Sequence, residues 1–437
     1  DDNIVQPALA RLEAAIGAAS GPPAGPTLAD LSCTTGQIAA RLSSGWTCLT
    51  PRPARVAVTE DVHLLDDGGD GPGGFRAGGN AALAIARDGR PVVVHQIADP
   101  LHGGADLATW LCDDVHCTSG SARVLELGAG AVLGDHASIA LGASGNPVIA
   151  HADASNGFLL AFVCSDATCG GGGATRILDR GDGDRVGSYA SIAVGADGVP
   201  VIAHQNATLG TLEVFVCADV GCTGGTGRTL DDGKGDRVGA FASIAVGADG
   251  NPVIAYGDST LGALKLFVCG DAHCTRGTAR ILEVGSGERV GLEASLAIGA
   301  DGNPVIAHRG SSGVLRLHAC GDPSCGTGSS HIVDPDAGSV GRVSVTIDAS
   351  GTPLVAYRDE SRGVVKLATC VDAVCTSARP RVLAVSGSSR IGGASAVAGA
   401  ADGAVLVVYE DTVNASLMMA RAVVVAEDTS LSPPATN

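Results

Sequence analysis

A unit of about 50 residues recurs along most of this 437-residue chain, and it constrains the fold more than any other feature. The clearest copies read SIAVGADGVPVIA (191–203), SIAVGADGNPVIA (243–255) and SLAIGADGNPVIA (295–307), and weaker copies begin at residues 81, 138, 344 and 395. The copies that start at serines 138, 191, 243, 295, 344 and 395 are 53, 52, 52, 49 and 51 residues apart. A period of this length, built from strand-like segments, is typical of β-propeller blades.

Each copy contains four short segments with the composition of strands. In one copy, segments 243–247 and 253–256 flank Asp249-Gly250-Asn251-Pro252, whose residue types favour a tight turn. Segments 263–269 and 279–284 flank a loop with two cysteines. Four strands per copy, repeated radially, predict an all-β fold in which every copy forms one blade.

The two ends of the repeat region complement each other. The last copy supplies strand segments near 395–400, 404–410 and 416–425 and then lacks a fourth. Ahead of the first complete copy, residues 62–68 read VHLLDDG and are similar to fourth strands such as RILDRG at 176–181. We therefore expect a seven-bladed propeller over 55–425 in which the N-terminal strand completes the seventh blade and removes both exposed edges. An open solenoid is the alternative, and it would leave this N-terminal strand unpaired.

The 14 cysteines are regularly spaced. Six pairs have the spacing Cys-x4-Cys and one pair precedes the repeats: Cys112/Cys117, Cys164/Cys169, Cys217/Cys222, Cys269/Cys274, Cys320/Cys325, Cys370/Cys375 and Cys33/Cys48. A zinc site is the alternative, but each pair would then need a second pair nearby. We predict local disulfides and an oxidising compartment. Closing so short a loop contributes at most about 2 kcal/mol for each Cys-x4-Cys bond.

The charge balance excludes several classes of partner. The chain has 28 Lys+Arg against 46 Asp+Glu, a net charge of −18, whereas nucleic acid and anionic lipid both require a basic surface. No apolar run approaches the ~18 residues of a membrane span. Because the sequence starts at Asp1 without a signal-peptide pattern, we expect a secreted protein from which the signal has been removed.

Residues 1–54 differ from the repeats and predict a separate N-terminal arm. Apolar residues recur at helical spacing over the first 17 residues, and a Pro- and Gly-rich linker follows at 21–26. Cys33 and Cys48 then frame a small hairpin. The arm could pack on its own propeller, but we favour a role in subunit assembly or anchoring. Residues 426–437 form a C-terminal tail.

The copies resemble a repeat that is widespread in secreted and cell-surface proteins of bacteria. Asp249-Gly250-Asn251-Pro252, Tyr256-Gly257-Asp258 and the Cys-x4-Cys pairs carry the resemblance, and LSCTTGQIAARLSSGWTC (31–48) is similar to a cystine hairpin of fibre-like surface proteins. The resemblance implies a β-propeller and an extracellular or cell-surface location. It implies no activity, because one fold hosts many functions.

An aromatic ring with a polar tip ends the second strand of every blade. The seven residues are His95, His151, His204, Tyr256, His308, Tyr357 and Tyr409. Ring symmetry would place them at one level, where a ligand could bind, and the four histidines could hold a transition metal if they pointed inward. The alternative is that each ring packs between two blades and hydrogen-bonds to the backbone. The exchange of His for Tyr favours packing.

Carboxylates recur on the same face. Asp184, Asp236 and Glu288 lie in the loops between blades, and Asp153, Asp258, Asp359 and Asp411 follow the second strands. Calcium could bind such oxygen donors, but the twelve-residue D-x-[DN]-x-[DN]-G loop is missing. We therefore expect these carboxylates to cap turns.

Few residues suggest an enzyme. The sequence contains no G-x-S-x-G, H-E-x-x-H or Walker motif. Five of the histidines outside the ring are expected at the surface: His102, His116, His136, His273 and His318. With 12 aromatic residues in total, only the His/Tyr ring or Trp110 would offer a sugar a stacking platform. Asn206 and Asn414 match the N-glycosylation sequon.

These features favour a non-enzymatic extracellular scaffold that binds protein partners or copies of itself. The alternative is a metal- or glycan-binding propeller, in the extreme a metalloenzyme, that uses the His/Tyr face. No cofactor is predicted; calcium or a transition metal is the option that the alternative leaves open.

Overall fold

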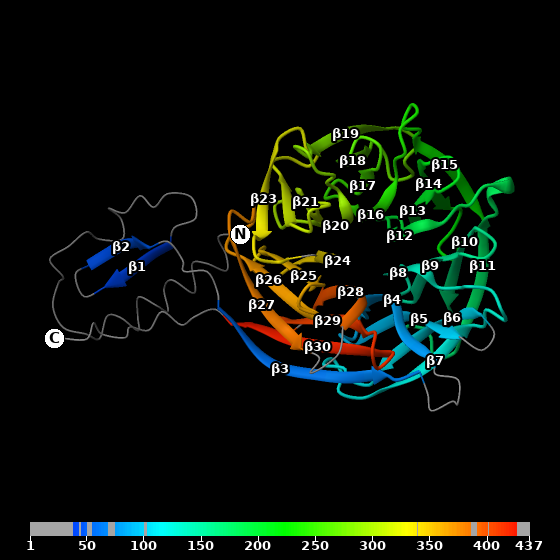
Figure 1. Cartoon of the computed structure of the whole chain (residues 1–437), viewed down its shortest axis with the longest axis horizontal. Helices are drawn as coiled ribbons and strands as arrows, with labels where there is room; N and C mark the ends of the chain where they lie inside the picture. Colours follow the sequence, from blue (N-terminus) through cyan, green and yellow to red (C-terminus); the bar gives the residue numbers. More distant parts are fainter. Residues whose placement is uncertain are drawn as a thin grey trace. The chain divides into compact units, whose positions relative to one another are not determined.

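The computed structural model describes residues 38–42, 45–49, 55–68, 75–99, 103–338, 340–385, 391–400 and 402–425. Between Arg55 and Val425 the strands form seven antiparallel sheets of four strands. Successive sheets contact one another through their first strands, and the first strand of the last sheet, β28, contacts β4 of the first (Figure 1). The fold is a seven-bladed β-propeller.

Six blades follow the chain order from the axis outward. Blade 1 contains β4 (Arg76–Ile85), β5 (Pro91–Asp99), β6 (Gly104–Cys112) and β7 (Gly120–Glu126). Blade 2 contains β8 (Asp135–Leu141), β9 (Pro147–Asp153), β10 (Phe158–Cys164) and β11 (Gly173–Asp179). Blade 3 contains β12 (Ser188–Val194), β13 (Pro200–Asn206), β14 (Thr211–Cys217) and β15 (Gly225–Asp231), and a short 3-10 helix, η2 (Gly181–Gly183), precedes it.

The second half of the ring repeats this order. Blade 4 contains β16 (Ala240–Val246), β17 (Pro252–Asp258), β18 (Ala263–Cys269) and β19 (Gly277–Val284). Blade 5 contains β20 (Leu292–Ile298), β21 (Pro304–Arg309), β22 (Leu315–Cys320) and β23 (Gly328–Asp334). Blade 6 contains β24 (Val340–Ile347), β25 (Pro353–Asp359), β26 (Val364–Cys370) and β27 (Ala378–Val385). Blade 7 contains β28 (Ile391–Gly399), β29 (Ala404–Asp411), β30 (Ser416–Val425) and β3 (Arg55–Asp66).

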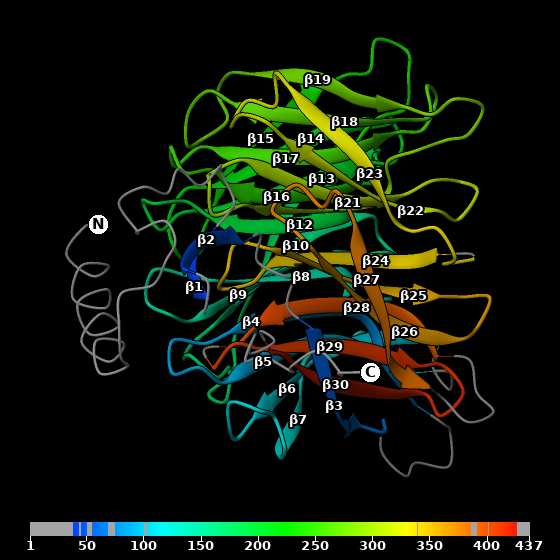
Figure 2. The same cartoon turned by 90° about the vertical axis from the view of Figure 1, so that its left-hand side faces the viewer.

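The ring closes as the sequence predicts. Strand β3 pairs antiparallel with β30, in a register that places Val62 opposite Ala420 and His63 opposite Met419. The first strand of the repeat region therefore forms the outer edge of the last blade, and Figure 2 shows β3 beside β30. The open solenoid is wrong, because neither end of the repeat region remains as an unpaired half-blade.

The predicted turns account for the strand boundaries. Gly250 has a φ of +81°, which glycine adopts without strain, and Asn251 N–H donates to Asp249 Oδ1 at 3.0 Å. Pro252 then opens β17, a position where a strand tolerates the missing N–H. The third strand lies where it is predicted, at Ala263–Cys269. The first strand instead begins at Ala240, three residues before the predicted start.

The core consists of small aliphatic side chains packed between neighbouring blades. Val, Leu, Ile and Ala from the first three strands of each blade are buried, so the chain needs few aromatic residues. The serine that starts the repeat unit also joins blades. Ser191 Oγ accepts a hydrogen bond from Ile244 N–H at 3.1 Å, and Ser243 Oγ accepts one from Leu296 N–H at 3.0 Å. The recurrence of this serine therefore has a structural reason.

The six Cys-x4-Cys pairs all form disulfides, which confirms that prediction and makes zinc ligation by these pairs wrong. The bonds are Cys112–Cys117, Cys164–Cys169, Cys217–Cys222, Cys269–Cys274, Cys320–Cys325 and Cys370–Cys375. Each bond links the end of a third strand to the loop before the fourth, with Cα atoms 4.7 to 4.9 Å apart. The disulfides are therefore staples on one face of the ring.

The loop inside each staple has a conformation that the spacing alone did not predict. The second cysteine of every pair has left-handed backbone, with φ between +47° and +56°: Cys117, Cys169, Cys222, Cys274, Cys325 and Cys375. Its N–H closes a turn; for example, Cys222 N–H donates to the Asp219 carbonyl oxygen at 3.1 Å. The bond therefore holds a tight turn and not an extended loop.

The chain divides into two compact units, Arg55–Ala426 and the terminal segments Asp1–Ala54 with Glu427–Asn437. In the terminal unit, β1 (Ile38–Leu42) and β2 (Gly45–Leu49) form an antiparallel pair. The predicted N-terminal helix, the linker, the Cys33–Cys48 disulfide and the C-terminal tail lie outside the described residues. Among the residues that are described, no helix has the length and hydropathy to cross a membrane.

Candidate functional site

The seven His and Tyr residues of the second strands lie between blades and are almost completely buried. Each is 0 % exposed except Tyr409, which is 2 % exposed. At six of the seven junctions, the fourth strand of the preceding blade ends with an acid at the position next to this His or Tyr. At the seventh junction this position is Ala384 of β27, which pairs with Val365 of β26. The closest nitrogen–oxygen or oxygen–oxygen distances are 3.3 Å for His95–Asp66, 2.7 Å for His151–Glu126, 3.4 Å for His308–Glu283 and 2.6 Å for Tyr256–Asp231.

Each imidazole is also fixed by the backbone of its own blade. The N–H groups of Gly78, Gly134, Gly187 and Gly291 donate to Nδ1 of His95, His151, His204 and His308 at 3.2 to 3.3 Å. Because Nδ1 accepts, a neutral ring carries its proton on Nε2, which faces the acid. This geometry agrees with the packing alternative.

The structure does not gather the four histidines around one point. Within the described parts of the chain, two clusters have three potential metal ligands close together, namely His318/Cys320/Cys325 and Asp179/His204/Glu213. Only His204 of the predicted metal set belongs to either. Ligand binding by His95, His151, Tyr256, His308, Tyr357 and Tyr409 stays a prediction.

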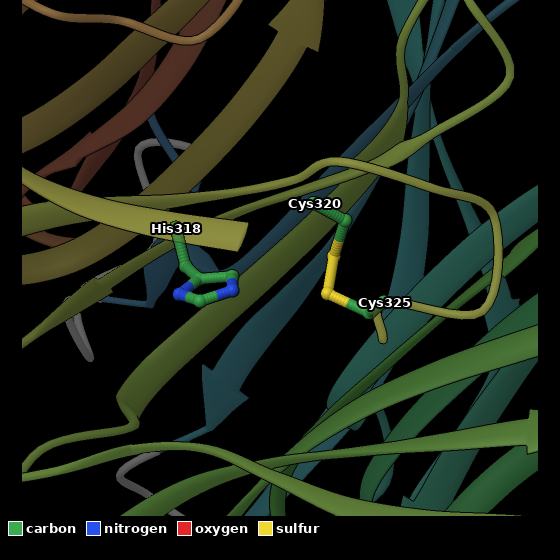
Figure 3. A group of neighbouring side chains, drawn as sticks. All are labelled: His318, Cys320 and Cys325. Carbon is green, nitrogen blue, oxygen red and sulfur yellow. A yellow bond between two sulfur atoms is a disulfide. The ribbon is translucent and has the colours of Figure 1, made fainter. Parts of the chain in front are cut away.

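The first of these clusters is a packing arrangement. Figure 3 shows His318 beside the Cys320–Cys325 disulfide, whose sulfur atoms are bonded to each other and so are not thiolate ligands. His318 takes the place of Phe267 in blade 4, and its Nδ1 lies 2.9 Å from Ser330 Oγ. Burial lowers the pKa of His318 to about 4, so the ring is neutral near pH 7.

The disulfide cysteines lie at the opposite end of the blades from the His/Tyr ring. In blade 2, for example, Phe158 at the start of the third strand pairs with Asp153, whereas Cys164 at its end pairs with Gly173. The second cysteines of the pairs are buried: Cys117, Cys169, Cys222 and Cys375 are each at most 1 % exposed. These cysteines are therefore structural and contribute no side chain to the face of the loops between blades.

Six of the seven acids expected to cap turns fall into two groups, and the role of Asp236 stays a prediction. Asp153, Asp258, Asp359 and Asp411 each accept N–H groups of their own turn, which confirms the prediction for them. Asp184 and Glu288 instead reach the next blade: Asp184 accepts from Asn206 Nδ2 at 3.0 Å, and Glu288 pairs with Arg316 at 2.7 Å. For Asp184 the prediction was wrong, because its loop lies against the second strand of the following blade. Glu288 also accepts the Ser312 N–H at 3.2 Å, so it caps a turn of the following blade and not of its own.

Three other expectations about exposed residues are also corrected. Asn206 is 3 % exposed, so its sequon is not an accessible glycosylation site in the folded chain. Trp110 packs partly buried on the core between blades 7 and 1, and is not an open stacking platform. His116 and His273 are half-exposed as expected and pair with Asp402 and Asp197, whereas His318 is buried. His102 lies outside the described residues.

A second ring of residues lines the axis, and the repeat pattern alone did not predict it. The innermost strands contain a bulge at their first residues; in β12, for example, Ser188 pairs with Gln205 but Ser191 pairs with Ala203. The residue in the bulge has a positive φ in five blades, between +49° and +56°: Asn80, His136, Tyr189, Phe241 and Glu293. Left-handed backbone in bulky residues is strained, and such strain concentrates at functional sites.

These bulges surround one cavity. The cavity has a volume of about 130 Å³ and is lined by residues of β4, β8, β12, β16, β20 and β24, the innermost strands of six blades (Figure 1). Its wall consists of His136, Tyr189, Phe241, Glu293 and Arg342, with small Ala and Val side chains behind them. The cavity therefore lies on the propeller axis, at the face of the loops between blades.

One side of the cavity is aromatic. The rings of His136 and Tyr189 have centroids 4.5 Å apart, and those of Tyr189 and Phe241 are 4.6 Å apart, with interplanar angles of 58° and 50°. Burial raises the pKa of Tyr189, and the nearby Glu293 carboxylate adds to this, so the phenol keeps its proton. Three adjacent blades thus supply a continuous apolar surface with polar edges.

The other side is polar and internally hydrogen-bonded. Arg342 donates to Asn80 Oδ1 at 3.0 Å, and Asn80 Nδ2 donates to Asp135 Oδ1 at 3.1 Å. Burial would raise the pKa of Asp135, but His136, 3.1 Å away, together with Arg342 and Asn80, lowers it overall. The wall therefore presents the Arg342 guanidinium and the Glu293 carboxyl group, and Arg342 is held in place by its hydrogen bond to Asn80, which in turn pairs with Asp135.

The sequence did hold a signal for this site. At the bulge position the copies carry Asn80, His136, Tyr189, Phe241, Glu293, Arg342 and Gly393, all different, while the neighbouring positions repeat Ala and Ser. His136 was expected at the surface, which was wrong, because the bulge turns its side chain toward the axis. Variation between copies at one position indicates that this residue is not needed for the packing that all blades share.

Comparisons with known proteins support the fold. No protein-family model and no curated protein sequence matches the chain. Among solved structures, the chain is similar to a protein of unknown function from Dyadobacter fermentans, with 12 % identity, a TM-score of 0.51 and coverage of 84 % of this chain and 99 % of that one. It is also similar to a puromycin hydrolase mutant (16 % identity, TM-score 0.51, 84 % and 56 % covered) and to the polysaccharide lyase Uly1 (8 %, 0.50, 85 % and 99 %). At these identities the likeness shows the fold alone.

Proposed function

We propose that the axial cavity binds carbohydrate and that this protein is a glycan-binding propeller. One observation carries the proposal: the bulge residues of five blades, which differ in chemistry from copy to copy, converge on a single cavity. A purely structural repeat needs no such variety, because the flanking positions pack with Ala and Ser alone. We therefore prefer glycan binding to the role of a non-enzymatic scaffold, and we expect the site on the axis and not at the buried His/Tyr ring.

The chemistry of the wall supports a sugar. A sugar ring has apolar C–H faces, which pack on aromatic rings such as Tyr189 and Phe241, and hydroxyl groups, which pair with carboxylate, amide and guanidinium groups. Glu293 and Arg342 supply such groups in the wall itself, in a half-buried setting. A cavity of about 130 Å³ fits a terminal residue of a glycan better than an internal stretch of chain.

Local charge narrows the class of glycan. Two carboxylates, Asp135 and Glu293, lie near one guanidinium, Arg342, and the whole chain has a net charge of −18. Polyanionic glycans would be repelled by the chain as a whole. We therefore expect neutral or amino sugars. Uly1, a polysaccharide lyase, shares the fold, but the proposal rests on the wall residues.

A larger cavity, about 350 Å³, lies on the opposite face between blades 3 and 4. Its polar groups are already paired: His273 Nε2 is 3.0 Å from Asp197 Oδ2, and Arg228 donates to the His273 carbonyl oxygen at 3.0 Å. A ligand there would have to break these contacts. The site therefore supports binding less well than the axis does.

The test is a glycan screen followed by calorimetric titration of the best neutral ligand. Tyr189→Ala and Phe241→Ala should each weaken binding by about five- to tenfold, the value of one aromatic contact. His273→Ala, on the opposite face, is the matched control and should bind like the wild type. The proposal fails if no glycan binds, or if the axial variants bind as well as the control.

A further inference from the structure

A second site lies at the junction between blades 2 and 3, away from the axis. The clue is the residue opposite the buried His or Tyr on the third strand. In blades 4, 5 and 6 this residue is a cation: Lys265 opposite Tyr256, Arg316 opposite His308 and Lys366 opposite Tyr357. In blade 3 the same position carries Glu213, opposite His204.

The cations neutralise the acid of the preceding blade. Lys265 lies 2.6 Å from Asp231, Arg316 lies 3.4 Å from Glu283, and Lys366 lies 3.0 Å from Asp334. At the junction of blades 2 and 3 the acid is Asp179, and Glu213 faces it with the same charge. Among the described residues, no Lys or Arg nitrogen lies within 4.0 Å of either carboxylate.

Further groups bring more negative charge to this junction. Asn206 Nδ2 donates both to Asp184 Oδ2 at 3.0 Å and to Glu213 Oε1 at 3.3 Å, which places the two carboxylates side by side. Burial raises the pKa of Glu213, and Asp179 and Asp184 raise it further, although hydrogen bonds from Asn206 and Thr211 act in the other direction. Three acids thus share a half-buried space, and no Lys or Arg of the described chain forms an ion pair with them.

His204 points into this space without a partner. It is 0 % exposed, and its Nε2 makes no hydrogen bond. A ring nitrogen of His204, one carboxylate oxygen of Asp179 and one of Glu213 lie within 4.8 Å of one another. Its Nδ1 accepts from Gly187, so the proton is on Nε2. A buried N–H with no acceptor is costly, and it indicates that something occupies the space between these groups.

We propose that Asp179, Asp184 and Glu213 bind one calcium ion, and that the Nε2–H of His204 donates to a water molecule held by the ion. The donors are all oxygen atoms, the set that hard cations prefer. Zinc and copper prefer an imidazole lone pair, but Nε2 carries the proton here. Oxygen ligands at about 2.3 to 2.6 Å from a common ion lie up to about 5 Å apart, which agrees with the Asp179 and Glu213 carboxylate oxygens that lie within 4.8 Å of each other.

The ion would neutralise the acids at the junction of blades 2 and 3, as Lys265, Arg316 and Lys366 neutralise the acids at the junctions of blades 4, 5 and 6 with their preceding blades. It would also fix the segment between Asp179 and Ser188, which leads directly to Tyr189 in the axial wall. The site does not depend on glycan binding, so the two proposals can fail separately.

The experiment is titration of the full, chelator-treated chain with CaCl2, followed by calorimetry and by thermal unfolding at constant ionic strength. We expect one Ca²⁺ per chain with a Kd of about 0.1–1 mM, in the range of extracellular calcium sites. Saturation should raise Tm by about 2–5 °C, because the ion binds only the folded state. Mg²⁺ should have a weaker effect, since it demands a smaller octahedral site.

Two variants separate this site from nonspecific binding. Glu213→Lys copies the arrangement of Lys265, so it should fold with an unchanged or higher Tm and should lose the response to Ca²⁺. Asp236→Asn changes the acid that corresponds to Asp184 in the next loop, and it should keep the full response. The proposal is overturned if the wild type shows no Ca²⁺-dependent shift, if Glu213→Lys keeps the shift, if Asp236→Asn removes it, or if Zn²⁺ binds the site more tightly than Ca²⁺.

Discussion

Each repeat contributes one side chain to each of two rings in the propeller. The residue type is nearly constant between copies in one ring and varies between copies in the other. The junction ring of His and Tyr is buried between blades, and its members interchange only between two flat rings with polar tips. Five members of the axial ring line a cavity, and the residue at this position differs in every copy. Both positions lie near the same face, because Ser188, next to Tyr189, pairs with Gln205, next to His204.

The difference shows how one repeat separates stability from binding. At the junctions every blade must meet its neighbour, so the same contact recurs and tolerates little change. On the axis the bulge frees one residue per blade from pairing, so that residue can change without loss of the ladder. Variants at the two rings should therefore differ in kind: those at the junctions should change stability, and those on the axis should change binding.

The largest effect is expected at the junction of blades 5 and 6. Asp334 is 3 % exposed and accepts from Tyr357 and from Lys366, the latter at 3.0 Å. Asp334→Ala leaves a buried ammonium with one remaining partner, Asp359, so it should reduce the free energy of unfolding by about 3–5 kcal/mol. Urea unfolding measures the loss.

The matched control for this variant is Tyr409→Phe. Its junction carries Ala384 where the others carry an acid, so removing the hydroxyl should cost less than about 1 kcal/mol. Equal losses for the two variants would show that the acid contributes nothing and that ring packing alone holds the junctions.

A smaller effect should depend on pH. Burial acts to raise the pKa of Glu283, but hydrogen bonds from His308 and Ser330 and the charge of Arg316 lower it to about 2. Because the folded-state pKa is below that of the unfolded chain, this stabilisation is complete above about pH 4.5 and is lost as the pH falls toward 2. We expect about 1–2 kcal/mol from this group.

Glu283→Gln tests the linkage. The variant should be less stable than the wild type at about pH 6, and the difference should shrink below about pH 4, as measured by urea unfolding at several pH values. A difference that stays constant over this window would contradict the assignment.

The disulfides should contribute less than the junctions. Replacing both Cys269 and Cys274 by Ser opens a loop with a sequence separation of 5 residues, and we expect a loss of at most about 2 kcal/mol. Differential scanning calorimetry of the double variant measures this loss. Unfolding of the double variant at room temperature would show that the staples matter more than the blade contacts.

Much of this fold could be predicted from the sequence, because its repeats contain their own turn chemistry. The Asp-Gly-Asn-Pro turns, the cysteine pairs and the extra strand before the first copy fix blade number and closure. The axial site could not be predicted in the same way, because it depends on a bulge that starts β16 at Ala240 and not at Ser243. Periodicity gives the register of a regular strand, but a bulge reverses which residue faces inward.

The acidic junction was missed for a related reason. Glu213 looks ordinary in the sequence, since four consecutive copies carry a charged residue at this strand position (Glu213, Lys265, Arg316 and Lys366), which resembles a solvated position. The role of Glu213 depends on Asp179 of the preceding blade and on Asp184, which come close to it only where blades 2 and 3 pack together.

The smallest change in stability, and the sharpest contrast with the junctions, is expected for Tyr189→Gly. Tyr189 has a φ of +54°, a conformation that glycine adopts without strain. The loss of ring contacts with His136 and Phe241 and the relief of backbone strain, each about 1 kcal/mol, should nearly cancel in the free energy of unfolding. Glycan binding should nevertheless fall, since the central ring of the aromatic wall is gone. A variant that unfolds as readily as Asp334→Ala would mean that the axial ring also holds the blades together, and the division between the two rings would then be wrong.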